Sequence, residues 1–455
     1  MAWQSMPQVS AETGAVAITG TDATLGVGGR IVAEAGAVDI TGVDATLRLG
    51  YGMEAQAGAV SLGGTDAALL AGHALAAESG VVDVAGVDAS LEHSYTLTAE
   101  AGAIDVTGTD AGLRATRTMP ADAGAAPIDG VDASLEFGRT VAADAGAVAI
   151  SGVDASLRIG RALIAEAGDA PITGVQAALL FGRLLGAEVG ATPVTGTDAV
   201  LAFGRIMPAD AGTTAIGGTD ANLVMGRVVI ADAGTVPIAG TDADLVYQGA
   251  RAIDAEAGAI PIGGTDAALV VGRAVQAEAG VLAITGTDAL LKAGWLVTAE
   301  GGAIAITGTQ AGLGAGYRVQ ADAGAIPVTA GAPVALLKGA RVIADAGAVP
   351  LTGTDADLVL ESATYSLDAE PGAVALAGIN AALLWSRIVV AEAGTVTIAA
   401  GIQANLVIGT VIPVFLGANA RSTLTDKDTS AGTLVTVNAH HASTLITVEN
   451  TENLE

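Results

Sequence analysis

Short runs in which apolar and polar residues alternate recur along almost the whole chain. Between two glycines lies a five-residue run such as AVDIT (37–41), AIDVT (103–107) or AVPLT (348–352), with Val, Ile or Leu at alternate places. A period of two is typical of a β-strand. An Asp-Ala-x-Leu phrase follows, then a variable stretch that ends in Gly-Arg, and then a run that ends in Ala-(Glu/Asp)-Ala-Gly. The pattern predicts three short strands per unit, joined by corners.

A helical alternative exists for the second half of the unit. The stretch TDAALLAGHALAAESG (65–80) is rich in Ala and Leu and starts with Thr and Asp, which can cap a helix. Other copies place β-branched residues or Pro in the same stretch, as in RVVIADAG (227–234) and RTMPADAG (117–124), and a glycine recurs in its middle. These residues disfavour a helix and favour strands.

The repeat length stays constant from Asp22 to Asp242 and equals the interval from Asp22 to Asp44. Small insertions lengthen two later steps, around VYQGAR (246–251) and LESATY (360–365), where we expect corners because corners tolerate extra residues. One degenerate copy lies near Ala332, and 18 units span roughly residues 8–410. The position of the repeated Asp is occupied in turn by Asp22, Asp44, Asp66, Asp88, Asp110, Asp132, Asp154, Gln176, Asp198, Asp220, Asp242, Asp266, Asp288, Gln310, Asp355, Asn380 and Gln403.

One glycine position accepts no other residue in any of the 18 copies, from Gly14 and Gly36 to Gly394. A second glycine, six residues later (Gly20, Gly42), behaves almost the same way. Such a position predicts either a positive φ or a close approach of another backbone.

A single unit of about 22 residues cannot bury its own apolar face, but stacked units can cover one another. The sequence therefore predicts an all-β, elongated repeat protein. Each unit is either one coil of a β-solenoid or a hairpin-bearing module of a stacked fibre. We divide the chain into an N-terminal anchor (1–10), a repeat shaft (11–410) and a C-terminal segment (411–455) that acts as a cap, an attachment module or an oligomerisation module. In this last segment GTLVTVNA (432–439) and STLITVEN (443–450) are typical of a β-hairpin.

Composition agrees with a thin core and narrows the partners. The 455 residues include 63 Gly and no Cys, and only Trp 3, Tyr 5 and Phe 4, so small aliphatic side chains must fill the interior. The formal net charge of −29 argues against a nucleic-acid partner, which needs clustered Lys and Arg. No stretch is long and apolar enough to insert into a membrane, and the N-terminal residues MAWQSMPQVS do not resemble a secretory signal.

The repeated Asp is the strongest candidate for chemistry. Periodic Asp in Gly-rich repeats is similar to the calcium-binding nonapeptide repeats, but in GGTDAALLAG (63–72) the large apolar Leu69 follows the Asp by three residues rather than two. Copies that lose the Asp carry Gln or Asn, which lack the charge that calcium favours. We therefore predict a side chain that bonds backbone amides at a turn, with calcium as the minority alternative and no cofactor in the preferred interpretation.

Two further rows of charge accompany the repeat. The acid of the AEAG phrase (Glu12, Glu34 and onward) is kept in 17 of 18 copies, with Gln56 as the exception, and is interpreted as a solvated stripe. An arginine stripe is expected to pair with these acids across neighbouring units and to soften their repulsion. The stripe includes Arg117, Arg139, Arg161, Arg183, Arg205 and Arg227.

The histidines do not form a recognisable site. His73 and His93 stand alone without a second ligand at metal spacing, and the neighbours His440 and His441 would face opposite ways on a strand. The chain carries no nucleophile elbow, phosphate loop, CxxC or HExxH motif. We predict that the protein is not an enzyme and assign no catalytic, cofactor-binding or metal-binding residue.

Tandem copies of AEAG-(A/S)-x-x-(I/L)-TG-x-DA-x-L-x-x-GR resemble the repeats of bacteriophage virion structural proteins of the tail-fibre or tail-tip-fibre type. The resemblance covers about nine-tenths of the chain, but its motif is low in complexity, and the strands here hold less Thr and fewer aromatic residues. It implies a non-enzymatic virion fibre, homotrimeric, that binds other virion proteins and meets a receptor on the host surface. Synthesis in the host cytoplasm without a signal peptide and release by lysis agree with this interpretation.

Two other functions remain open at this point. A bacterial surface adhesin or extracellular matrix filament, exported by a dedicated system and requiring calcium, would show a similar repeat. An ice- or glycan-binding solenoid would need a flat, regular Thr array, and the Thr positions in ITGT, VAGV and IGGT vary too much for one.

Overall fold

The structure is a computed structural model that describes most of the chain, and its described residues are strands and connecting segments without a helix. The chain forms two compact units, unit 1 (Met1–Leu245) and unit 2 (Val246–Glu455). The prediction of an all-β chain is confirmed. The residues outside the described part are 1–5, 116, 226–227, 248–251, 332–333, 338–340, 360–365, 370–371, 386–387, 392–394, 409–414, 417–420, 427–435 and 439–455.

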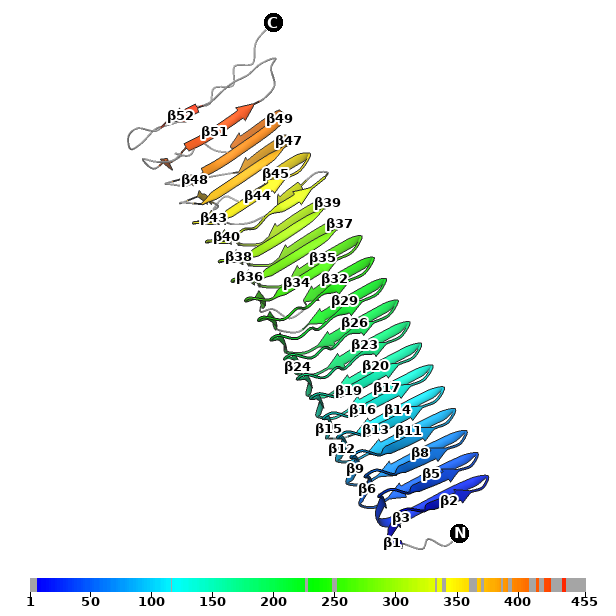
Figure 1. The fold of residues 1–455 in the computed structure, drawn as a ribbon. Coiled ribbons are helices and arrows are strands. Elements are labelled where there is room, and N and C mark those ends of the chain that lie inside the picture. The colour runs from blue at the N-terminus through cyan, green and yellow to red at the C-terminus, as the bar shows by residue number, and fades with distance from the viewer. Residues whose placement is uncertain are drawn as a thin grey trace. The chain divides into compact units, whose positions relative to one another are not determined.

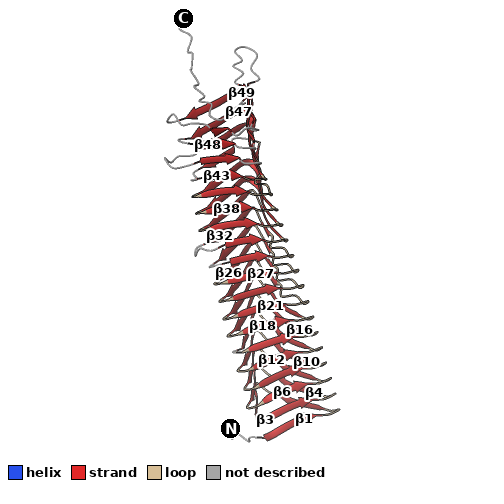
Figure 2. Ribbon diagram, turned by 90° about the vertical axis from the view of Figure 1, so that its left-hand side faces the viewer, coloured by secondary structure: helices blue, strands red, loops and turns tan. Residues whose placement is uncertain are grey.

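Each repeat of unit 1 forms one coil with three strands and three corners, as β4 (Ala37–Thr41), β5 (Asp44–Leu49) and β6 (Gly52–Ala55) illustrate. We name the stack of strands like β4 face A, the stack like β5 face B and the stack like β6 face C. The corners between successive faces are AB, BC and CA. Figures 1 and 2 show the stacked strands from two directions.

The strands of unit 1 fall into these three stacks. Face A holds β2 (Ala15–Thr19), β4, β7 (Ala59–Gly63), β10 (Val81–Ala85), β13 (Ala103–Thr107), β16 (Ala125–Asp129), β19 (Ala147–Ser151), β22 (Ile172–Thr173), β25 (Val194–Thr195), β28 (Ile216–Gly217) and β31 (Ile238–Ala239). Face B holds β3 (Asp22–Ala33, which continues into face C), β5, β8 (Asp66–Ala71), β11 (Asp88–His93), β14 (Asp110–Ala115), β17 (Asp132–Phe137), β20 (Asp154–Ile159), β23 (Gln176–Phe181), β26 (Asp198–Phe203), β29 (Asp220–Met225) and β32 (Asp242–Tyr247). Face C holds β1 (Met6–Ala11), β6, β9 (Ala74–Ala77), β12 (Thr96–Ala99), β15 (Thr118–Ala121), β18 (Thr140–Ala143), β21 (Ala162–Ala165), β24 (Leu184–Ala187), β27 (Ile206–Ala209) and β30 (Val228–Ala231).

Successive coils of unit 1 pair in parallel, and each residue lies opposite its equivalent one repeat later. Val38 lies opposite Val60, Asp44 opposite Asp66 and Met53 opposite Leu75. The repeat is therefore a parallel β-solenoid, and the alternative of stacked hairpin modules is excluded for these coils. Equivalent residues of neighbouring coils lie one strand spacing apart, about 4.8 Å.

The core of unit 1 consists of the inward-facing alternate residues of all three faces. In one coil Val38 and Ile40 come from face A, Leu47 from face B and Met53 from face C, and each has 0% exposure. Aliphatic side chains of this size fill the narrow interior, which explains the shortage of aromatic residues.

Close approach of the preceding coil explains the invariant glycine at corner CA. A Cβ on Gly36 would lie 2.1 Å from the carbonyl oxygen of Gly14, and Gly58 and Gly80 show the same conflict with the coil before them. Gly14 itself, in the first coil, has nothing within 4 Å. Gly36, Gly58 and Gly80 do not have a φ in the left-handed region, so for these glycines the close approach is the correct one of the two predicted reasons.

Unit 2 repeats the same parallel pairing. Ala274 lies opposite Leu296, one repeat later as in unit 1, whereas Arg318 lies opposite Arg341 and that step is longer by a single residue. Face A and B strands are β34 (Ala259–Gly263), β35 (Asp266–Val271), β37 (Val281–Ala293), β39 (Ala303–Ala315), β41 (Val328–Ala330), β42 (Val334–Leu337), β44 (Ala348–Thr352), β45 (Asp355–Val359), β47 (Ala373–Trp385) and β49 (Thr395–Ile408), of which β37, β39, β47 and β49 run through both faces. Face C strands are β33 (Ala252–Ala255), β36 (Ala274–Ala277), β38 (Leu296–Ala299), β40 (Arg318–Ala321), β43 (Arg341–Ala344), β46 (Ser366–Ala369), β48 (Ile388–Ala391) and β50 (Phe415–Leu416).

The ends of the repeat differ in detail from the sequence-based boundaries. Strand β1 starts at Met6 and pairs with β3, so the first coil begins inside the segment expected to be an anchor. At the other end β51 (Arg421–Asp426) extends face A in parallel with β49, and β52 (Thr436–Asn438) pairs antiparallel with β51. The predicted hairpin partner of β52, residues 443–450, lies outside the described residues, as do Trp3 and most of the two inserted stretches, 248–251 and 360–365.

Candidate functional site

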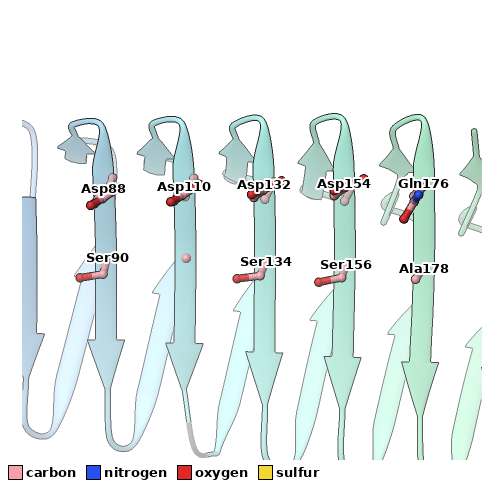
Figure 3. A pocket seen from close by; sticks show the side chains of 14 residues that line it. Asp88, Ser90, Asp110, Asp132, Ser134, Asp154, Ser156, Gln176 and Ala178 are labelled. Carbon is pink, nitrogen blue, oxygen red and sulfur yellow. The ribbon is translucent and has the colours of Figure 1, made fainter. Parts of the chain in front are cut away.

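The repeated Asp forms an acidic row along the start of face B, and a shallow groove runs beside it. The groove has a volume of about 550 Å³ and crosses five coils, from β11 to β23. Figure 3 shows the repeated carboxylates above a second row of small residues two positions later. The lining residues are Asp88, Ala89, Ser90, Asp110, Ala111, Gly112, Asp132, Ala133, Ser134, Asp154, Ala155, Ser156, Gln176 and Ala178. We call this feature the acidic groove.

The predicted turn role of the repeated Asp is wrong for the described residues. The backbone amide of Asp110 donates to the carbonyl oxygen of Val87 at 2.9 Å, and that of Asp132 donates to Thr109 at 2.9 Å. The carboxylates of Asp88, Asp132 and Asp154 are exposed, as is that of Asp110. In the described part of the chain these carboxylates form no hydrogen bond with the corner backbone. The parallel ladder already satisfies the corner amides, so the carboxylates are left to face solvent.

Calcium binding gains no support from this arrangement. The residues that the structure describes contain no group of three or more His, Cys, Asp or Glu side chains arranged to hold a metal ion. Calcium therefore stays a minority hypothesis, on the sequence argument alone.

The AEAG acids form a second acidic row, at corner CA. Glu34, Glu100 and Glu166 are exposed there, which agrees with the predicted solvated stripe. The row lies one face away from the acidic groove, because face A separates corner CA from corner AB.

The arginine stripe lies at corner BC. Its predicted pairing with the AEAG acids is wrong for Arg139 and Asp144 of unit 1. In unit 2, by contrast, burial and Asp322 raise the pKa of the AEAG acid Asp345, and the charges of Arg318 and Arg341 oppose this rise. Arg139 and Asp144 lie at opposite ends of the four-residue strand β18. Five residues of extended chain span roughly 16 Å, which is beyond the reach of the two side chains. Arg30 instead forms an ion pair with Glu54, and Arg114 forms one with Glu136 at 2.7 Å.

Aromatic residues continue the arginine stripe at corner BC, a feature that the sequence reasoning missed. The rings of Tyr51 and His73 stack with centroids 5.4 Å apart, those of His73 and Tyr95 stack at 4.8 Å, and Arg117 lies 4.4 Å over Tyr95. These four residues recur at the repeat interval, and that spacing is the signal that could have found the stack. His73 is therefore part of an exposed stack rather than incidental.

His93 is a core residue whose two ring nitrogens both lie beside carbonyl oxygens. It is 3% exposed, and Nδ1 and Nε2 lie 3.1 Å and 2.7 Å from the carbonyl oxygens of Ala71 and Thr96. Burial lowers its pKa, against the opposing effect of these hydrogen bonds. Its role is structural, while His440 and His441 lie outside the described residues.

The carboxyl group of Asp254, on face C of unit 2, lies in an environment that disfavours its charged form. The Oδ1 atom of Asp254 is buried without a hydrogen-bond partner. Burial first, and then the charges of Glu278, Glu256 and Glu300, raise the pKa of Asp254 to about 6.

We expect Asp254→Asn to stabilise the protein at pH 7. A carboxyl with a raised folded-state pKa contributes stability that is present below its unfolded pKa of 3.8 and lost as the pH rises through 6. The thermal unfolding midpoint of Asp254→Asn should therefore exceed that of the native chain at pH 7, and the two should converge below pH 4. Asp266→Asn, which removes an exposed carboxyl from face B, is the matched control. Equal midpoints of Asp254→Asn and the native chain at pH 7 would contradict the assignment.

The comparisons with known proteins give no relative from which a site could be transferred. Scans against models of protein families, curated proteins and solved structures found no match. Among the described residues, no helix has the length and apolar character required to cross a membrane.

Proposed function

We propose that the chain is a non-enzymatic structural fibre protein of a bacteriophage virion, of the tail-fibre or tail-tip-fibre type, which acts in assembly and host-surface contact. One observation supports this most: within each unit, coils pair in register, so every exposed position is repeated as a row along the stack. Such surfaces offer extended, repetitive contacts. The choice of a virion fibre among repetitive fibre proteins rests on the resemblance of the repeats to those of bacteriophage virion fibre proteins.

The proposal includes partners and a location. The fibre belongs to the virion, is made in the host cytoplasm, associates with copies of itself as a homotrimer, and binds other virion proteins and a host receptor. The high negative charge favours solubility and repulsion between neighbouring particles at distances where no specific contact forms.

Labelling intact particles tests the proposal. Antibodies raised against the purified chain, carrying gold, should label fibres at the tail of phage particles in electron micrographs of a lysate. Label on the surface of uninfected bacteria, with none on particles, would contradict the virion assignment and favour the adhesin or matrix filament. Imaging the purified chain with and without a chelator then separates a calcium-dependent filament from a fibre that needs no metal.

A further inference from the structure

A row of arginines that forms no ion pair with other described residues lies along corner BC of unit 1. The five residues are exposed. They lie above one another in successive coils, because a backbone amide of the next coil donates to the carbonyl oxygen of each arginine, as the amide of Thr140 does to Arg117 at 2.9 Å. None of them forms an ion pair within the described residues. With about 4.8 Å between neighbours, the guanidinium groups repel one another. The row consists of Arg117, Arg139, Arg161, Arg183 and Arg205.

The acidic rows of the same coils cannot neutralise it. Asp132 and Arg139 are separated by strand β17, and seven residues of extended chain span roughly 23 Å. The AEAG acids lie beyond face C, as described above. Glu136, the acid nearest to Arg139 along face B, is already bonded to Arg114 through Oε2 at 2.7 Å.

The acidic groove has the complementary chemistry. It crosses five coils, as the arginine row does, and offers one carboxylate in each of four of them, with Ser90, Ser134 and Ser156 beside them. Carboxylates and hydroxyls are acceptors for the five N–H donors of a guanidinium. Exposed valines border the groove and can cover the aliphatic part of the arginine side chains: Val131, Val153 and Val175 are 47%, 46% and 50% exposed.

Equal spacing makes these two surfaces fit over their whole length. Each row places one charged residue in each coil. The distance between neighbouring arginines in one copy therefore equals the distance between neighbouring carboxylates in another copy. A charge that finds its partner in one coil therefore finds it in the next coils too. The charges of a polyanion do not in general have the spacing of the arginine row.

We propose that copies of the chain associate side by side, with the arginine row of one copy lying in the acidic groove of the next. The contact uses different surfaces on the two partners, so it closes into a ring or continues as an array. Each exposed ion pair contributes only about 0.2–1 kcal/mol, so the contact needs several pairs at once. The contact weakens at high salt, because salt screens exposed charges. The inference stands independently of the virion assignment.

A charge exchange between two full-length variants tests the contact. The row variant carries Arg139→Glu, Arg161→Glu and Arg183→Glu, and the groove variant carries Asp110→Lys, Asp132→Lys and Asp154→Lys. The control variant has the same acid-to-lysine changes as the groove variant, placed at corner CA, with Asp122→Lys, Asp144→Lys and Glu166→Lys. All nine positions are polar and none is fully buried, so we expect the coils to form, which circular dichroism checks.

Sedimentation velocity at low and high salt gives the readout. The native chain and the control variant should associate at low salt, and each test variant alone should associate at least about tenfold more weakly. Mixing the row and groove variants should restore association. In the mixture the glutamates of the row variant face the lysines of the groove variant, and the native arginine row of the groove variant faces the native acidic groove of the row variant. A native chain that stays monomeric at low salt, or test variants that associate as the native chain does, would overturn the proposal. Binding of dextran sulfate to a monomeric native chain, lost in the row variant, would overturn it too and assign the row to a polyanion.

Discussion

Gly146→Ala is expected to destabilise unit 1 strongly. A Cβ at this position would lie 2.1 Å from the carbonyl oxygen of Gly124 and 2.8 Å from that of Ala121, both in the preceding coil. These are backbone atoms fixed by the parallel ladder, so no side-chain rotation can relieve the conflict. We expect a loss of about 3 kcal/mol or more in the free energy of unfolding, at the upper end of the cost of overpacking.

Gly186→Ala is the matched control for this experiment. Gly186 lies on strand β24 of the same unit, and a Cβ there has no atom within 4 Å. The substitution should change stability by less than about 0.5 kcal/mol. Guanidinium unfolding followed by far-ultraviolet circular dichroism compares the two variants, and hydrogen exchange of the β19 amides shows whether the damage is centred on the altered coil. Equal midpoints for Gly146→Ala and Gly186→Ala would contradict the close coil contact.

Leu135→Ala should have the second large effect. Leu135 has 0% exposure and lies between Leu113 and Leu157 of the neighbouring coils, each 1% exposed. Removing a buried leucine to alanine costs about 2–5 kcal/mol, depending on how far the surroundings collapse into the cavity. Backbone hydrogen bonds fix the coil spacing here, so we expect little collapse and a loss of about 3 kcal/mol or more.

Ser134→Ala on the same strand is the control, because its side chain points outward into the acidic groove. Its stability should stay within about 0.5 kcal/mol of the native chain. Urea unfolding of both variants gives the difference. A Leu135→Ala variant as stable as Ser134→Ala would mean that the inward and outward faces of β17 have been assigned wrongly.

The sequence predicts the coil well because each coil repeats the same local rules. Alternating Val and Ile in runs such as AVDIT locate face A, and the glycines locate the corners, where Gly36 and Gly42 lie. The choice between a solenoid and stacked hairpins needed the structure. Three alternating strands are compatible with both, and only the parallel pairing of Asp44 with Asp66 decides between them.

The placement of charge was harder to predict for a physical reason. Arg139 and Asp144 are close in sequence, but strand β18 between them is extended and carries them to different corners. The repeated Asp was expected to satisfy a corner amide, yet in a parallel stack the preceding coil accepts from that amide, as Thr109 does from Asp132. Both errors come from treating a unit in isolation, whereas its neighbours decide where its polar groups point.

Distances between spin labels test the stacking of coils most directly. The chain has no cysteine, so labels can be attached to cysteines introduced in pairs at Thr46 with Ser134, Ala178 or Asn222, which occupy the same outward position of face B in unit 1. Pulsed electron resonance should give narrow distances that grow by about 10 Å for every two coils, from roughly 19 Å to 29 Å and 38 Å. Broad distributions, or distances that do not increase in equal steps of this size, would contradict the solenoid.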